Sequence, residues 1–186
     1  MKEIAIEGLD GAGKTSVAQE LADIYANEGL RAHVAAPYRL AEKKLGADLF
    51  PLWRSDRGAE MAIDVIHGAL MDTQEEHADA DVLIYDRHWM TAFTEIAGRP
   101  ELVARWGDTF VPTAYLRVDP AVARARAGND ETSPWMEERN FQGYAGRYTA
   151  LCHEMGEHLL GIYRNDDDVT QAAIAQSIAW DARIRR

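Results

Sequence analysis

The sequence of 186 residues has little of what defines several protein classes. It has one cysteine, Cys152, so no disulfide can form within the chain. No apolar run approaches the roughly 18 residues that a membrane-spanning helix needs. Lysine and arginine total 20 against 31 acidic residues, and the net charge of −11 argues against a nucleic-acid partner. We therefore expect one cytoplasmic domain, residues 1–186, that binds neither a membrane nor DNA or RNA.

A glycine-rich segment near the start is the most informative feature present. Residues 8–15 read Gly-Leu-Asp-Gly-Ala-Gly-Lys-Thr, which fills every position of the P-loop pattern G-x-x-x-x-G-K-[ST]. Lys14 is placed to reach the β- and γ-phosphates of a nucleotide, and the Thr15 hydroxyl is placed to ligate Mg²⁺. The motif predicts that the chain binds ATP or another nucleoside triphosphate with Mg²⁺. The predicted nucleotide-binding residues are Gly8, Gly11, Ala12, Gly13, Lys14, Thr15 and Ser16.

Apolar runs and helical patterns alternate along the chain. The apolar runs read as five strands, residues 3–7, 31–36, 81–86, 113–119 and 158–164. Strands separated by helices indicate an α/β fold with a parallel sheet covered on both faces. The glycine-rich segment follows the first strand and precedes a helix, so backbone N–H groups and the positive end of the helix dipole would meet there and favour phosphate.

Two polar residues end the third predicted strand. Asp86 and Arg87 follow an apolar run directly, and ligands of open parallel sheets bind at the carboxyl ends of the strands. A carboxylate there can hold Mg²⁺ or accept a proton, and an arginine can clamp phosphate oxygens with two hydrogen bonds. We predict that Asp86 and Thr15 bind the metal, and that Lys14, Asp86 and Arg87 carry the chemistry.

The P-loop together with Asp86-Arg87-His88 resembles the thymidylate kinase family of P-loop nucleoside monophosphate kinases. The resemblance covers nearly the whole chain in the order and length of its elements. It implies a three-layer P-loop kinase sandwich with a five-stranded parallel sheet, a small helical lid at about residues 124–140, and a homodimer. It also implies that the γ-phosphate of ATP is transferred to a small-molecule nucleotide, a nucleoside monophosphate.

The family's roles carry over only to matching positions. Asp10 would lie under the acceptor sugar, and Arg39, in a Pro-x-Arg segment, would grip the acceptor phosphate. Arg87 would grip the same phosphate or the transferring group. The stretch that begins at Arg124 resembles the start of the lid. Its candidate cations for the γ-phosphate are Arg124, Arg126 and Arg139.

Two departures from the family concern the acceptor. Residues 61–67 have no arginine where the family reads the pyrimidine base, which leaves His67 as a candidate substrate-binding residue. The second strand ends in Ala36-Pro37, where many members have Glu-Pro. The resemblance implies a pyrimidine deoxynucleotide, dTMP or a related or modified one, as the acceptor, while another nucleotide or a bare nucleoside is also compatible with the remaining residues.

Three other functions remain to be weighed. A deoxynucleoside kinase would share the P-loop, but those enzymes end strand two in a carboxylate that acts as base, and this chain has alanines there. A GTPase switch would need an Asn-Lys-x-Asp segment, which the sequence lacks. A non-catalytic or regulatory nucleotide-binding protein would bind the triphosphate without transferring phosphate to any acceptor.

Overall fold

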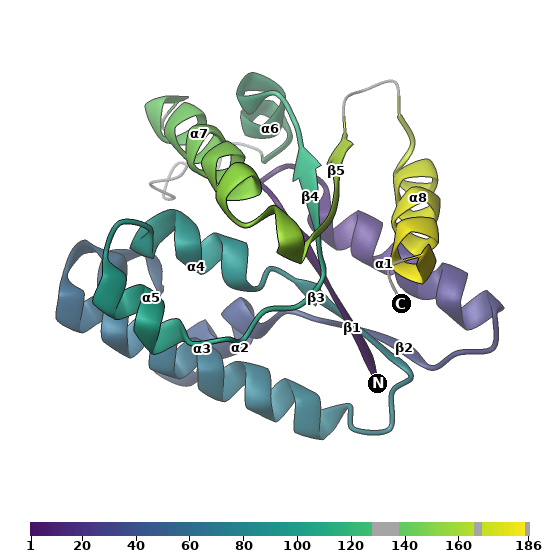
Figure 1. The fold of residues 1–186 in the computed structure, drawn as a ribbon, viewed down its shortest axis with the longest axis horizontal. Coiled ribbons are helices and arrows are strands. Elements are labelled where there is room, and N and C mark those ends of the chain that lie inside the picture. The colour runs from purple at the N-terminus through teal and green to yellow at the C-terminus, as the bar shows by residue number, and fades with distance from the viewer. Residues whose placement is uncertain (128–137, 166–168, 185–186) are drawn as a thin grey trace.

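Five parallel strands form one sheet in the order β2-β3-β1-β4-β5 (Figure 1). The computed structural model describes residues 1–127, 138–165 and 169–184, without the side chains of residues 138–140. The strands span Lys2–Glu7 (β1), Ala32–Ala35 (β2), Val82–Asp86 (β3), Thr113–Arg117 (β4) and Leu159–Arg164 (β5). This arrangement confirms the predicted α/β fold with a five-stranded parallel sheet.

Helices cover both faces of the sheet (Figure 1). The α-helices span Lys14–Asn27 (α1), Pro37–Leu45 (α2), Asp56–Glu76 (α3), Trp89–Ile96 (α4), Pro100–Trp106 (α5), Pro120–Ala127 (α6), Glu138–Glu154 (α7) and Gln171–Ile184 (α8). Two 3₁₀ turns are Phe50–Arg54 (η1) and Gly156–His158 (η3). Helices α1 and α8 lie together on one face, and α3, α4, α5 and α7 lie on the other.

The central strands are apolar because both of their faces are buried. Ile4 and Ile6 of β1 and Leu83 and Ile84 of β3 have no exposed surface. Ile6 pairs with Asp86, so the P-loop leaves β1 at the same edge where β3 ends. The sheet thereby brings two segments that are distant in sequence to one place.

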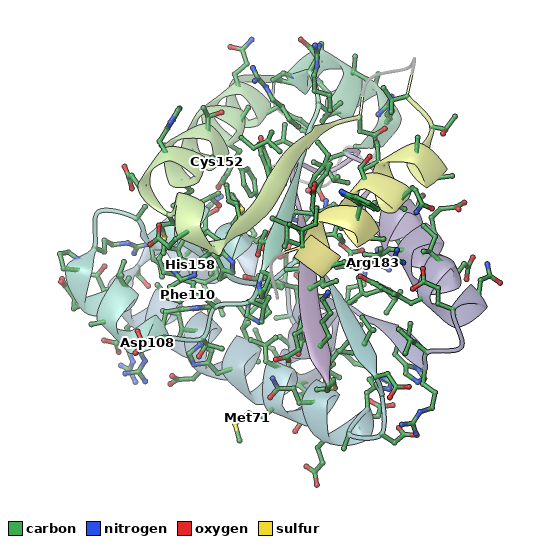
Figure 2. All side chains as sticks on the ribbon, turned by 45° about the vertical axis from the view of Figure 1, so that its right-hand side comes forward. Met71, Asp108, Phe110, Cys152, His158 and Arg183 are labelled. Carbon is green, nitrogen blue, oxygen red and sulfur yellow. The ribbon has the colours of Figure 1, made fainter. Side chains whose placement is uncertain are left out.

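Aromatic side chains fill the core around the start of β4. The rings of Phe110, just before β4, and His158, in η3, stack with centroids 4.3 Å apart (Figure 2). The indole of Trp89 donates a hydrogen bond of 2.7 Å to the hydroxyl of Thr113. These contacts fix the start of α4 against β4, close behind the residues that end β3. Cys152, also labelled in Figure 2, lies half-buried on α7.

The predicted strands match the observed ones to within two residues at each end. Strand β2 is shorter than predicted because Pro37 opens α2 directly, and β4 ends at Arg117 rather than at residue 119. The proposed lid falls largely on residues 128–137, which lie outside the described part of the chain. The lid therefore remains a prediction. The assignment of residues 1–186 to a single domain also remains a prediction. Among the helices that the structure describes, none is long and apolar enough to cross a membrane.

Candidate nucleotide-binding site

The P-loop takes a backbone path that requires glycine. Gly11 and Gly13 have φ values of 74° and 81°, in the left-handed region that side chains disfavour. A Cβ atom on Gly11 would overlap the carbonyl oxygen of Ala123 in α6, and one on Gly13 would lie 2.5 Å from the Asn165 side-chain nitrogen. The glycines therefore allow α6 and the end of β5 to approach the loop closely.

Asn165, which follows β5, holds the loop from that side. Its buried side-chain amide donates a hydrogen bond of 2.7 Å to the carbonyl oxygen of Ala12. The backbone carbonyl oxygen of Asn165 accepts a hydrogen bond of 2.8 Å from the Arg126 guanidinium. Our sequence prediction missed Asn165, although a polar residue directly after the fifth strand was a signal, because the ends of all five parallel strands meet at this edge.

The side chain of Lys14 is buried against the P-loop backbone. Its ammonium group donates a hydrogen bond of 2.8 Å to the carbonyl oxygen of Leu9 and lies 3.9 Å from the carboxylate of Asp10. Burial and the nearby Arg87 guanidinium lower the pKa of Lys14 to about 8. The amine thus keeps its proton only at a cost, which an additional anion such as a phosphate would relieve.

The side chains of Thr15 and Asp86 meet where β1 and β3 end. The Thr15 hydroxyl donates a hydrogen bond of 2.5 Å to the Asp86 carboxylate, which is 7% exposed. One hydroxyl and one carboxylate are hard oxygen donors, which suit Mg²⁺. Within the described residues, no group of three or more His, Cys, Asp or Glu is arranged to hold a metal. This donor set fits an ion that takes its other ligands from water and phosphate oxygens.

Arg87 lies between the P-loop and the rest of the cavity. Its backbone has a φ of 76°, a strained conformation for a residue with a side chain. The guanidinium pairs with the Asp10 carboxylate and donates a hydrogen bond of 3.3 Å to the Thr91 hydroxyl. Although burial disfavours its charge, Asp10 and the other acids nearby raise the pKa of Arg87, so it stays a cation. Asp10 has a lowered pKa, because Arg87 and Lys14 outweigh the opposing effect of burial.

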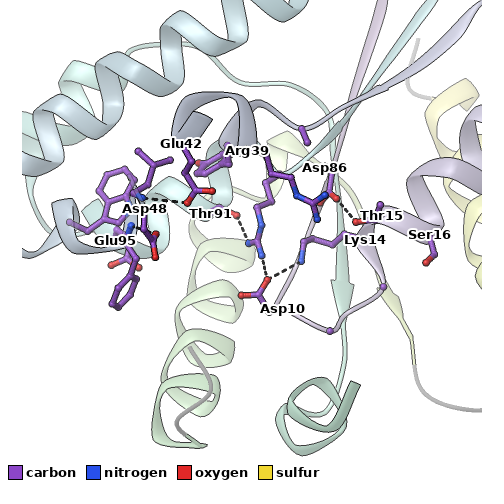
Figure 3. Close-up of a pocket in the computed structure, with 18 residues that line it drawn as sticks. Asp10, Lys14, Thr15, Ser16, Arg39, Glu42, Asp48, Asp86, Thr91 and Glu95 are labelled. Carbon is purple, nitrogen blue, oxygen red and sulfur yellow. Dashed lines mark hydrogen bonds and ion pairs between the residues drawn. The ribbon is translucent and has the colours of Figure 1, made fainter. Parts of the chain in front are cut away.

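One cavity of about 430 Å³ joins these residues (Figure 3). On one side it is lined by the P-loop and its surroundings: Asp10, Gly11, Gly13, Lys14, Thr15, Ser16, Asp86 and Arg87. On the other side, which we call the acceptor lobe, it is lined by Ala36, Tyr38, Arg39, Glu42, Asp48, Leu49, Phe50, Trp53, Thr91 and Glu95. In Figure 3 the labelled acids Glu42, Asp48 and Glu95 lie at the end away from Thr15 and Ser16.

Two thymidylate kinases are similar to this chain in sequence. No protein-family model matches the chain. A thymidylate kinase of Xanthomonas euvesicatoria pv. vesicatoria is 28% identical over 203 residues, covering 96% of this chain and 87% of that protein. A thymidylate kinase of Xanthomonas campestris pv. campestris (strain B100) is 27% identical over 194 residues, covering 95% and 82%. The chain is a distant homologue of the thymidylate kinases. This homology and the sheet order support the resemblance to the P-loop nucleoside monophosphate kinases.

Three carboxylates, of Glu42, Asp48 and Glu95, line the acceptor lobe. The Glu95 carboxylate accepts a hydrogen bond from the Tyr144 hydroxyl and lies 3.6 Å from the Arg147 guanidinium. Burial raises the pKa of Glu95, and burial together with neighbouring Asp48 raises that of Glu42. Sequence reasoning missed these acids and the apolar wall beside them, Leu49, Phe50 and Trp53. No motif marks them, because α2, η1 and α4 bring them together only in the fold.

Most of the side chains predicted for the site meet in this cavity, but His67, Arg124 and Arg126 do not line it, and the Arg126 guanidinium instead donates a hydrogen bond to the backbone carbonyl oxygen of Asn165. His67 does not line it: its ring packs against Trp106 with centroids 4.7 Å apart, between α3 and α5. We therefore withdraw His67 as a base-binding residue. Arg124 lies exposed on α6, outside the cavity lining, although α6 itself closely approaches Gly11. The side chain of Arg139 lies outside the described residues.

The two remaining P-loop positions act through the backbone. Gly8 has no room for a side chain, since a Cβ atom would lie 2.6 Å from the carbonyl oxygen of Leu116 in β4. Ala12 is fully buried and presents its carbonyl oxygen to Asn165. Neither residue is in the cavity lining, so both shape the loop and offer no side-chain group to a ligand.

Proposed function

We propose that this protein transfers the γ-phosphate of ATP, with Mg²⁺, to a pyrimidine deoxynucleoside monophosphate, dTMP or a related or modified one. The observation that supports this most is the place of Arg87. Its guanidinium stands between a P-loop with Lys14 and an acceptor lobe with an aromatic wall, all in one cavity. A cation at that position can neutralise an acceptor phosphate and the phosphoryl group that moves toward it.

The roles follow from what each group can do. Backbone N–H groups of residues 11–15 and the Lys14 ammonium would hold the triphosphate, and Thr15 with Asp86 would hold Mg²⁺. Bound Mg²⁺ supplies positive charge that stabilises the negative charge developing on the phosphate oxygens. Arg39, exposed at the mouth of the lobe, would add a second cation for the acceptor phosphate. Asp10, paired with Arg87, would fix the direction of that guanidinium and contact the acceptor sugar.

The acceptor lobe is compatible with a nucleoside. Trp53 and Phe50 offer aromatic surface against which a base can pack, while Glu42, Asp48 and Glu95 can accept hydrogen bonds from it. A monophosphate rather than a bare nucleoside is favoured because Arg39 and Arg87 both line the cavity beside this lobe. A neutral 5′-hydroxyl would bring no negative charge to these two cations.

The test is product formation from ATP and Mg²⁺ with a panel of nucleosides and their monophosphates. The panel includes dTMP, dUMP, dCMP, a 5-hydroxymethylpyrimidine deoxynucleotide and the purine deoxynucleotides. We expect ADP and a nucleoside diphosphate in equal amounts from at least one pyrimidine deoxynucleotide. Arg87→Ala should raise the KM for that acceptor while leaving ATP binding intact, and Arg57→Ala, an exposed arginine on α3, serves as the matched control. Phosphorylation of nucleosides in place of monophosphates, or nucleotide binding with no transfer at all, would contradict the proposal.

A further inference from the structure

The short turn that carries Arg87 is held from several sides. The Arg87 N–H donates a hydrogen bond of 3.1 Å to the carbonyl oxygen of Ile6 in β1. The Tyr38 hydroxyl, on α2, donates one of 2.6 Å to the carbonyl oxygen of His88. A residue with a side chain at a φ of 76° needs such support, because the conformation is unfavourable by itself.

The carboxylate of Glu7 is the centre of this support. Glu7 ends β1 and is completely buried. One of its oxygens accepts hydrogen bonds from the backbone N–H groups of His88, at 2.7 Å, and Thr91, at 3.2 Å. The other oxygen accepts one of 2.6 Å from the Thr91 hydroxyl. All three donors belong to the turn after β3 and the first turn of α4, directly beside Arg87.

The Thr91 hydroxyl connects Glu7 to the Arg87 guanidinium by hydrogen bonds. Because the hydroxyl gives its one proton to Glu7, its oxygen acts only as an acceptor toward other groups. It accepts a hydrogen bond of 3.3 Å from the Arg87 guanidinium and contacts the Tyr148 hydroxyl of α7 at 2.9 Å. Tyr148 must then be the donor in that contact. The two lone pairs of the Thr91 oxygen therefore accept from Arg87 and Tyr148. Both are available because Glu7 takes the Thr91 proton and donates nothing to that oxygen.

We propose that Glu7 is a positioning residue that aims Arg87 at the acceptor phosphate through Thr91. This inference rests on the proposed function, since it assumes that Arg87 meets that phosphate. A carboxylate is suited to the task because it only accepts hydrogen bonds. A glutamine of the same shape would turn an NH₂ group toward the Thr91 oxygen, which would then face three donors with two lone pairs. Either Arg87 would lose this acceptor, or the Thr91 hydroxyl would donate its freed proton to Tyr148, which reverses that hydrogen bond and takes the Thr91 acceptor from the buried Tyr148 hydroxyl proton.

The arrangement also links α7 to the site. Tyr148 reaches the same Thr91 oxygen as Arg87, and its ring stacks on Tyr115 of β4 with centroids 5.3 Å apart. The aim of Arg87 thus depends on groups from β1, α4 and α7, none of which our sequence analysis assigned to the site. Such an arrangement costs the burial of a charge, which is offset only if its hydrogen bonds are all made.

The experiment compares Glu7→Gln with Glu3→Gln in the full chain, after wild-type transfer to a deoxynucleoside monophosphate has been established. Glu3 lies on the same strand, and its carboxylate likewise accepts hydrogen bonds, from Tyr85 and Gln74, but away from the cavity. We expect Glu7→Gln to raise the acceptor KM about tenfold or more, as for a lost hydrogen bond to a charged group. The KM for ATP should not change, and Glu3→Gln should behave like the wild type.

A second pair covers the case in which Glu7→Gln does not fold. Thr91→Val removes the hydroxyl and keeps the backbone donor to Glu7, whereas Thr91→Ser keeps the hydroxyl. We expect the valine variant to raise the acceptor KM and the serine variant to restore it. The proposal is overturned if a folded Glu7→Gln variant has the wild-type acceptor KM, if Glu3→Gln raises it equally, or if the valine and serine variants do not differ. A wild-type protein that phosphorylates no monophosphate would instead overturn the proposed function.

Discussion

The hydroxyl of Thr15 and the carboxylate of Asp86 lie 2.5 Å apart, although 71 positions separate them in the sequence. The P-loop supplies the hydroxyl and the end of β3 supplies the carboxylate. Adjacent parallel strands with Ile6 paired to Asp86 make this meeting a consequence of the sheet register. Together they form the donor pair that we assign to Mg²⁺.

Asp86→Asn should therefore raise the Mg²⁺ concentration needed for half-maximal transfer, by about tenfold or more if the carboxylate contacts the ion directly or through water. The amide keeps an oxygen for the Thr15 hydroxyl, so the fold should persist. Activity measured against Mg²⁺ at fixed ATP checks this, with Asp23→Asn on the exposed side of α1 as the control. An unchanged Mg²⁺ dependence would remove Asp86 from the metal site.

The parts of this pair could be predicted from sequence because each has a local signal. The P-loop is a contiguous motif. Asp86 follows an unbroken apolar run, Val82 to Tyr85, which is apolar throughout because both faces of the sheet are covered there. Where a strand is buried on both sides, its end is also the place where polar residues reappear. Sequence and structure agree there because a single local pattern determines both.

The acceptor lobe had no such pattern. Glu42, Asp48 and Trp53 come from α2, the following loop and η1, and only the packing of these elements brings them to Glu95 of α4. His67 shows the opposite error. Ile63, Ile66 and Leu70 of α3 are buried, and a residue four positions after Ile63 shares its face, so helical spacing already placed His67 toward the core. The candidate role of His67 came from the family resemblance alone, whereas in the structure its ring packs against Trp106.

Lys14→Met should abolish most transfer without destabilising the protein. The Lys14 side chain is 6% exposed, so its charged ammonium group has lost most of its hydration. The pKa of Lys14 in the folded state, about 8, lies below the ordinary value of 10.5. Folding is thus opposed by this charge below pH 8, and the opposition fades as the pH rises from about 8 toward 10.5.

The free energy of unfolding of Lys14→Met, relative to the wild type, should accordingly be higher at pH 7 than at pH 9.5. Denaturant titrations at the two pH values measure this difference, and other titrating groups cancel in the comparison. Lys43→Met, an exposed position on α2, should show no such change with pH. A difference that stays constant with pH would mean that the Lys14 amine titrates normally.

Glu95→Gln should alter which base the proposed kinase activity prefers. A carboxylate accepts hydrogen bonds and cannot donate them, whereas an amide does both. The wild-type lobe should favour bases that present an amino or hydroxyl group, and the variant should gain relative activity toward bases that present carbonyl oxygens, such as thymine. Ratios of kcat/KM for dTMP and dCMP check this, because sites built for one hydrogen-bonding pattern discriminate against the other. Glu101→Gln, exposed on α5, is the control. An identical ratio in wild type and variant would place Glu95 outside base recognition.

Gly11→Ala should be more damaging than Gly46→Ala, although both glycines have a similar φ, 74° and 68°. An alanine at position 46 meets no atom within 4 Å, so it should cost only the left-handed conformation, about 1 kcal/mol. At position 11 the added Cβ also overlaps the carbonyl oxygen of Ala123, which forces α6 away from the P-loop. We expect a lower thermal midpoint than for Gly46→Ala and a loss of transfer activity that Gly46→Ala does not show. Equal effects on stability and activity would mean that α6 yields freely, and that its close approach to the nucleotide loop has no part in catalysis.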